Sequence, residues 1–277
     1  MLKVLTSGVH TFLICDKEGN IHNLVSCSEA VFDNNDKEKT ESPLESLFAF
    51  QWIQNWSQEK IAITLTSHGD ILIFSDGELK FVQRRSKWYR VKLTELIHWM
   101  PDTQHYDEKM KKAIAETCLD VSFRRTGACI GIIRKDEYIK YLVEQEDIIA
   151  TSTKPRIQFL KKIIGDRKFQ EIPREIRQEL AAVDGAIVLG KDGTILSIGA
   201  ILKIGHLPQR NRTTGGRSVA AQQLACYGFG IKVSADGCIS AWRNKTEFEN
   251  ACPRKDKEQN EISCDMFCEH EKFFELF

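Results

Sequence analysis

Residues 184–242 read DGAIVLGKDGTILSIGAILKIGHLPQRNRTTGGRSVAAQQLACYGFGIKVSADGCISAW, and this stretch decides the fold. It contains two pairs of apolar, strand-like segments, which turn at Asp192-Gly193 and at Asp236-Gly237. Asp-Gly between such segments is a strong signal for a β-hairpin, because glycine tolerates a positive φ. A loop rich in glycine and arginine separates the pairs and leads into small residues at 220–227. The stretch therefore predicts two hairpins that flank a loop and a helix.

The sequence before this stretch also alternates between helical and strand patterns. Apolar residues near helical spacing predict a helix over 108–125 that ends at Gly127, followed by a buried strand at 128–133. Further helices are expected at 136–144, 155–164 and 173–182, and further strands at 186–189, 195–200, 231–233 and 238–242. The fold class predicted for residues 107–245 is α/β, with a mixed sheet flanked by helices.

The first hundred residues have a β-rich pattern instead. Strands are expected at 9–15, 21–27, 61–66, 71–74, 79–84 and 88–91, with a loop at 33–43 and a short helix at 44–56. A polar break at 101–109 separates this part from the α/β part. We therefore predict a β-rich domain over 1–100, the α/β domain over 107–245 and a charged tail over 246–277. In the alternative arrangement, the hairpin at 69–81 pairs with the sheet that contains 184–198, and the chain forms one continuous domain.

The composition limits the partners and the location of the protein. Lys and Arg together number 39, as do Asp and Glu, so no net field attracts the chain to nucleic acid or to a membrane. The first residues lack the apolar run of a signal peptide, and no segment approaches 18 apolar residues. The nine cysteines are scattered, as buried free thiols are. We expect a cytoplasmic protein without a membrane segment, for which nucleic acid is not the partner.

The loop before residue 220 has the composition of a phosphate site. Gly215 and Gly216 leave the backbone N–H groups accessible, and Arg217 adds a guanidinium near the start of the expected helix. Asp184 precedes the strand at 186–189 and offers a carboxylate to a metal ion or a hydroxyl. The alternatives are a solvated arginine at the end of a flexible loop and an aspartate that only caps a strand.

The order of these segments resembles that of diadenylate cyclase domains, over about half of the chain. The resemblance rests on the helix at 108–125, the strand GACIGII, the Asp184-Gly185-Ala186 motif and the loop TGGRSVAA at 214–221. It implies that the nucleotide contacts Asp184, Gly185, Ala186, Thr214, Gly215, Gly216, Arg217 and Ser218. It also implies that Asp184 is the metal ligand and the catalytic residue of an active enzyme. Such an enzyme condenses two ATP with Mg²⁺ or Mn²⁺ between two facing domains, so the resemblance implies a homo-oligomer.

This chain departs from the family's phosphate-binding motif. Gly216, Ser218 and Val219 stand where the family has Thr, His and Arg, and Val183 replaces the His before the aspartate. Losing a phosphate contact from arginine typically costs ~2–4 kcal/mol of transition-state stabilisation. The chain is therefore similar to a divergent branch that is thought to sense a nucleotide or cyclic dinucleotide, which implies a separate effector protein. The alternatives are an active diadenylate cyclase and a structural interaction module with an empty site.

The C-terminal cysteines raise the separate question of a structural metal. Cys252, Cys264, Cys268 and His270 do not have the spacing of a zinc finger. A metal site there remains an alternative, which the spacing disfavours.

Overall fold

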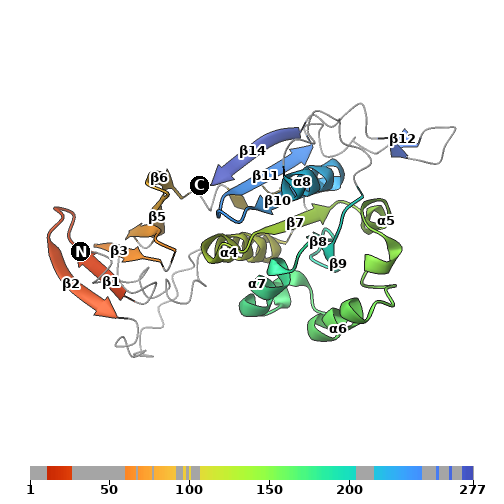
Figure 1. Cartoon of the computed structure of the whole chain (residues 1–277), viewed down its shortest axis with the longest axis horizontal. Coiled ribbons are helices and arrows are strands. Elements are labelled where there is room, and N and C mark those ends of the chain that lie inside the picture. The colour runs from red at the N-terminus through yellow and green to blue at the C-terminus, as the bar shows by residue number, and fades with distance from the viewer. Residues whose placement is uncertain are drawn as a thin grey trace. The chain divides into compact units, whose positions relative to one another are not determined.

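The structure of the chain is a computed structural model, shown in Figure 1. It describes residues 11–26, 60–66, 68–76, 78–91, 96–97, 100, 107–203, 215–244, 254–255, 262–263 and 270–276. Apart from the last two residues, the chain divides into two compact units with a boundary after residue 94. The segments at 33–43 and 44–56, for which a loop and a helix were expected, lie outside the described residues.

The first unit contains an antiparallel sheet of six strands in the order β2-β1-β3-β4-β5-β6. The strands are β1 (Thr11–Cys15), β2 (Ile21–Ser26), β3 (Ile61–Leu65), β4 (Ile71–Ser75), β5 (Glu78–Arg84) and β6 (Lys87–Arg90). Alternate residues such as Leu72, Phe74 and Val82 are fully buried. Arg84 Nε donates to the Asp70 carboxylate at 3.0 Å, and both side chains are buried. Each of the six expected strands coincides with an observed strand, although their bounds differ, and residues 9, 10 and 27 of the expected strands lie outside the described residues.

The second unit contains a mixed sheet in the order β14-β11-β10-β7-β8-β9. Its strands are β7 (Ala128–Ile133), β8 (Ala186–Leu189), β9 (Ile195–Ala200), β10 (Gly228–Val233), β11 (Ile239–Asn244) and β14 (His270–Leu276). The pair β7–β8 is parallel, whereas β8–β9, β10–β7 and β10–β11 are antiparallel. The α/β class and the mixed sheet are thus as predicted. The hairpin at 69–81 and the segment 184–198 belong to different sheets.

The C-terminal segment contains strands that the sequence did not predict. Residues 246–277 were expected to be a charged tail, but β14 pairs beside β11 at the edge of the mixed sheet. Two further short strands, β12 (Arg254–Lys255) and β13 (Ile262–Ser263), pair with each other. Edge strands tolerate charged residues, so charge alone was a poor reason to expect no strand here.

Within residues 107–244, each expected helical segment is observed; α6 has the expected bounds, and the others differ at one or both ends. They are α4 (Glu108–Arg124), α5 (Ile139–Leu142), α6 (Pro155–Ile164), α7 (Arg174–Ala182) and α8 (Gly216–Tyr227), with 3₁₀ turns η2 (Asp136–Tyr138), η3 (Gln145–Asp147) and η4 (Phe169–Glu171). Helix α4 ends at Arg124, and its C-cap is Arg125, whose φ is 58°, and not Gly127. The segment 136–144 is a 3₁₀ turn followed by a single helical turn. Helix α8 begins at Gly216 and not at 220, so Arg217 and Ser218 lie in its first turn.

Helix α8 lies directly on one face of the mixed sheet because two glycines make room for it. Gly131 of β7 and Gly230 of β10 are paired across the strands. A Cβ atom on Gly230 would lie 1.9 Å from the Ala221 carbonyl oxygen, and one on Gly131 would lie 2.5 Å from Leu224 Cδ2. This close approach fixes the height of α8 above the sheet, and apolar side chains of both elements form one buried cluster there.

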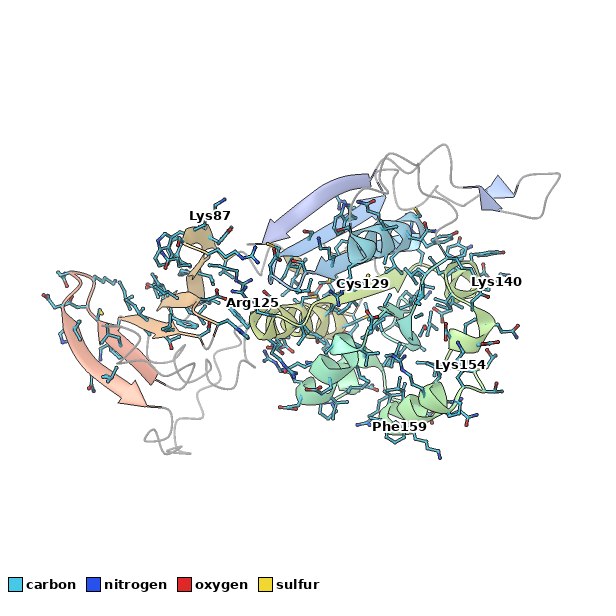
Figure 2. The ribbon with its side chains drawn as sticks, in the orientation of Figure 1. Lys87, Arg125, Cys129, Lys140, Lys154 and Phe159 are labelled. Carbon is cyan, nitrogen blue, oxygen red and sulfur yellow. The ribbon has the colours of Figure 1, made fainter. Side chains whose placement is uncertain are left out.

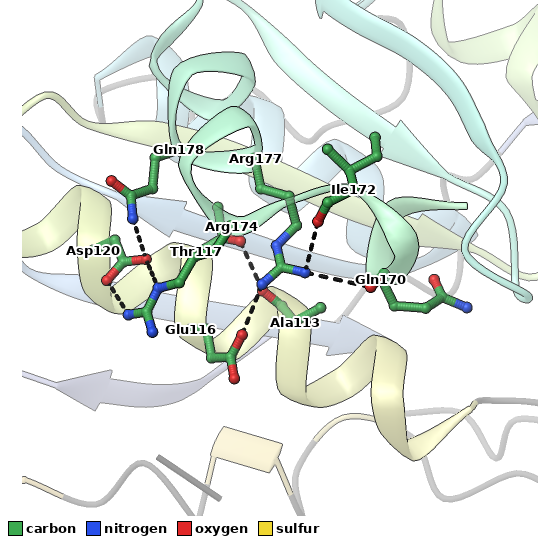
Figure 3. Close-up of polar contacts among 9 residues, drawn as sticks. All are labelled: Ala113, Glu116, Thr117, Asp120, Gln170, Ile172, Arg174, Arg177 and Gln178. Carbon is green, nitrogen blue, oxygen red and sulfur yellow. Dashed lines mark hydrogen bonds and ion pairs between the residues drawn. The ribbon is translucent and has the colours of Figure 1, made fainter. Parts of the chain in front are cut away.

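Helices α4 and α7 are joined by a buried polar network (Figure 3). Arg177 Nη2 donates to the Glu116 carboxylate at 2.7 Å, and Arg174 binds both oxygens of the Asp120 carboxylate. Gln178 adds a hydrogen bond to Asp120 at 2.7 Å. Burial lowers the pKa of Arg177, although the negative charge of Glu116 opposes that shift. The network holds α7 on α4, and α7 ends two residues before Asp184.

Candidate functional site

A cavity of about 570 Å³ lies at the end of the mixed sheet where β7 and β8 begin and β9 and β10 end. The strand registers bring these ends together, because Val233 pairs with Ala128, Cys129 with Ala186, and Ala186 with Ala200. The cavity is lined by Cys129, Asp184, Gly185, Ala186, Ala200, Ile201, Leu202, Gly215, Gly216, Arg217, Ser218, Ala220, Lys232, Ser234 and Ala235. Cys129, labelled in Figure 2, marks its position on β7.

The cavity gathers the described residues that the sequence singled out. Asp184, Gly185 and Ala186 enter it from the start of β8, and residues 215–218 enter it from the start of α8. The two motifs are about thirty residues apart in the chain but face one space. Thr214, also predicted as a nucleotide contact, lies outside the described residues. The grouping is a matter of geometry, and the role of each residue stays a prediction.

Gly185 has a packing reason for its place after Asp184. Its φ is 108°, a region that disfavours side chains. A Cβ atom there would lie 2.4 Å from the carbonyl carbon of Gly199 on β9. The glycine therefore lets the chain enter β8 in close contact with β9, and this entry leaves Asp184 exposed at the edge of the cavity.

The first turn of α8 presents positive charge to the cavity. The first N–H groups of a helix have no partner within the helix and carry a partial positive charge. The first turn holds no acidic residue, and Gly215 makes no side-chain cap. The guanidinium of Arg217 lies over Gly127, whose added Cβ would be 2.7 Å from Nη1. The guanidinium of Arg217 thus lies beside the residue that precedes β7.

Burial dominates the chemistry of the one thiol in the cavity lining. It raises the pKa of Cys129 to about 12, although the charge of Arg217 acts in the opposite direction. A thiol with such a pKa stays protonated at neutral pH and is a poor nucleophile. Cys129 is therefore a wall of the cavity and not a reactive group.

Two polar residues of the lining were missed by the sequence analysis, namely Lys232 and Ser234. Lys232 Nζ donates a hydrogen bond to the Ser218 hydroxyl at 3.0 Å. A lysine at the end of the apolar strand GFGIKV was a usable signal, because it is the one charged residue of β10. Val219 does not line the cavity. It is buried in the apolar cluster between α8 and the sheet.

The carboxylates give little support for a metal site made by the protein alone. Among the described residues, no three His, Cys, Asp or Glu side chains are placed to hold a metal ion. Asp184 is the one carboxylate among the residues that line the cavity. Mg²⁺ is commonly bound through one or two carboxylates together with substrate phosphates. Asp184 fits a metal that arrives with a nucleotide. Cys252, Cys264 and Cys268 lie outside the described residues.

Comparisons with known proteins give partial likenesses in structure alone. No family model and no curated protein matches the chain. A hypothetical membrane spanning protein from Bacillus cereus is 18% identical, with a TM-score of 0.34, and the match covers 46% of this chain and 56% of that one. A double mutant of DacA from Staphylococcus aureus is 22% identical, with a TM-score of 0.30, over 48% of this chain and 81% of that one. The chain thus spans little more than half of the Bacillus protein. In the described residues of the present chain, no helix has the length and apolar character needed to cross a membrane.

Proposed function

We propose that this chain binds a nucleotide or a cyclic dinucleotide in the cavity between Asp184 and Arg217, and that it acts as a sensor in prokaryotic signalling. The observation that carries the proposal is the convergence of three features on one cavity. They are the carboxylate of Asp184, the guanidinium of Arg217 and the start of α8, whose N-cap Gly215 has no side chain to cap it. We further propose that a separate effector protein reads the ligand-bound state.

The lining offers a place for each part of a nucleotide. The start of α8 and Arg217 suit phosphate, which accepts hydrogen bonds from N–H groups and bidentate bonds from guanidinium. The apolar wall made by Ala186, Leu202 and the exposed Ile201 suits a base or a sugar face. The carboxylate of Asp184 suits a ribose hydroxyl or a metal ion bound to phosphate.

Catalysis is disfavoured by what occupies the two positions after Arg217. Ser218 is uncharged, and its hydroxyl accepts a hydrogen bond from Lys232. Val219 is buried in the apolar cluster and has no polar atom to offer. Phosphoryl transfer depends on positioned charge around the transferred group. We therefore propose binding with little or no turnover.

Calorimetric titration with ATP and with cyclic di-AMP tests the proposal. Arg217→Ala should weaken binding by ~1.5–3 kcal/mol, the range for a hydrogen bond to a charged group. Arg124→Ala is the control, because Arg124 lies on α4 outside the cavity lining and pairs with Glu179 at 2.8 Å. Its removal should leave the affinity unchanged. If the wild-type protein binds neither compound, the proposed function is wrong.

A second measurement separates the sensor from an active cyclase, which would work as a pair of facing chains. The pure protein is incubated with ATP and Mn²⁺, and the products are separated by chromatography. We expect no cyclic di-AMP. Robust formation of cyclic di-AMP that Asp184→Asn abolishes would replace the sensor with an enzyme. Mass spectrometry of nucleotides that co-purify with the protein would identify the ligand directly.

A further inference from the structure

We infer that Lys232 is a ligand-binding residue and that it forms, with Arg217, a two-cation site for adjacent phosphate groups. The inference rests on the proposed nucleotide site and names the charges that hold the ligand in it. Lys232 lies on β10, whereas the sequence analysis placed the phosphate-binding residues only in the loop before residue 220.

The alternation of β10 directs Lys232 toward α8. Phe229, Ile231 and Val233 occupy one set of alternate positions and are all buried. The other set is Gly228, Gly230 and Lys232, and Gly230 lies under the backbone of α8. Successive side chains of a strand point to opposite faces. Because the other two residues on this face are glycines, Lys232 is the one residue of β10 with a side chain toward α8. It lies at the end of the strand that borders the cavity.

Neither cation of the cavity has a counter-ion among the described residues. Lys232 is half-buried, and its ammonium contacts the neutral hydroxyl of Ser218, which leaves further donors of the ammonium available. Arg217 is also half-buried, and it takes part in no ion pair found among the described residues. Half-buried charges without partners are unfavourable, and an anionic ligand would remove that cost.

The charges around the cavity also favour an anion with more than one negative charge. The lining contains two cations and one carboxylate, that of Asp184. The first turn of α8 adds the positive end of a helix and carries no acidic residue. A ligand with several adjacent phosphate groups therefore has more favourable electrostatic interactions with this cavity than a neutral ligand.

Two ligands, ATP and inorganic triphosphate, are titrated against the full-length wild type, Lys232→Met, Lys232→Arg and the control Lys161→Met. Lys161 is exposed near the end of α6 and outside the cavity lining, so its loss removes one charge from the protein without changing the site. We expect Lys232→Met to weaken both ligands by about 10- to 100-fold. Lys232→Arg should recover most of the affinity, and Lys161→Met should bind like the wild type. The affinity of Lys232→Met should also depend less on salt, because one ionic contact is lost.

The outcomes separate this inference from the proposed function. If ATP binds the wild type and Lys232→Met equally well, the inference is wrong and the nucleotide site stands. If the wild type binds triphosphate but neither ATP nor cyclic di-AMP, and Lys232→Met no longer binds triphosphate, the nucleotide function is wrong and the two-cation site stands. If neither ATP nor triphosphate binds the wild type, the two-cation site is refuted. Melting temperatures of all variants are measured, since a purely structural role of Lys232 would lower stability without a change in affinity.

Discussion

Replacing Gly230 with alanine should move α8 and damage the cavity from a distance. The added Cβ would lie 1.9 Å from the carbonyl oxygen of Ala221 and 2.8 Å from its carbonyl carbon. Ordinary contacts begin at 3.4 Å, so the helix and the strand must separate by about 1.5 Å. The obstructing atoms belong to backbone, so no change of rotamer relieves the contact.

The magnitude follows from overpacking and from the chain entropy of alanine. Extra methylene groups in a packed core typically cost about 1–3 kcal/mol, and a backbone obstruction belongs at the upper end. Alanine in a strand recovers about 0.5–1 kcal/mol relative to glycine. We expect a net loss of roughly 2–3 kcal/mol, which for a unit of this size lowers the melting temperature by roughly 4–12 °C. Because α8 carries Arg217 into the cavity, nucleotide affinity should fall as well.

Gly131→Ala is the matched comparison, since Gly131 is the cross-strand partner of Gly230. Its added Cβ would meet the side chain of Leu224 at 2.5 Å, and a side chain rotates more readily than a helix moves. Gly216→Ala is the control for stability, because its Cβ would meet nothing within 4 Å. Thermal unfolding followed by circular dichroism should rank Gly230→Ala as least stable, then Gly131→Ala, then Gly216→Ala. Wild-type stability of Gly230→Ala would refute this account of how α8 is placed.

Three further predictions concern the buried charges, the thiol of the site and the division of the chain. Arg177→Met leaves the buried carboxylate of Glu116 without its partner, so the free energy of unfolding, measured by chemical denaturation, should fall by about 3–5 kcal/mol. Adding Glu116→Leu to Arg177→Met should restore most of this loss. Equal stability of the single variant Arg177→Met and the double variant would contradict this prediction. Burial raises the pKa of Cys129 to about 12 from an ordinary 9.0, so between pH 9 and pH 12 the folded state keeps the thiol proton that the unfolded state loses. The protonated thiol therefore contributes its full share of stability below pH 9, and this share is lost as the pH rises toward 12. Iodoacetamide at pH 8 should therefore label the Cys129 peptide only after unfolding, and rapid labelling of the native protein would show that the thiol is not buried. A fragment that begins at residue 95 should unfold cooperatively and bind the same nucleotide, because the second unit has its own sheet and core, whereas its aggregation would show that the units depend on each other.

Local signals in the sequence predicted most of the fold. The hairpins β8–β9 and β10–β11 followed from the Asp-Gly pairs, since turn chemistry is local. Helix α8 was predicted to begin four residues late, because Gly216 and Arg217 read as loop by composition. Strand β14 was not predicted, because its pairing with β11 depends on a tertiary contact and not on its own charged residues.

The site was predictable where its residues are near one another in sequence, and less so where a strand register decides the contact. Asp184 and residues 215–218 were found as two motifs, but nothing local places them in one cavity. Their meeting depends on the pairing of β7 with both β8 and β10. Lys232 was missed for the same reason. Its contact with Ser218 needs both the alternation of β10 and the position of α8 above the glycines.

Ser218 and Val219, where the sequence departs from the diadenylate cyclase motif that it resembles, have different surroundings, although they are neighbours in the sequence. Ser218 faces the cavity, and its hydroxyl holds the ammonium of Lys232, so the position still takes part in the polar lining. Val219 belongs to the core, because it is part of the buried apolar cluster to which Leu224 and Tyr227 of the same helix also belong. An arginine at 219 would bring a charge into that cluster, at a cost that burial of an unpaired charge makes large. The packing of α8 therefore places position 219 in the core, and in the two-cation site that we propose the second cation comes from β10. A phosphate bound in that proposed site would contact cations from two elements, Arg217 of α8 and Lys232 of β10.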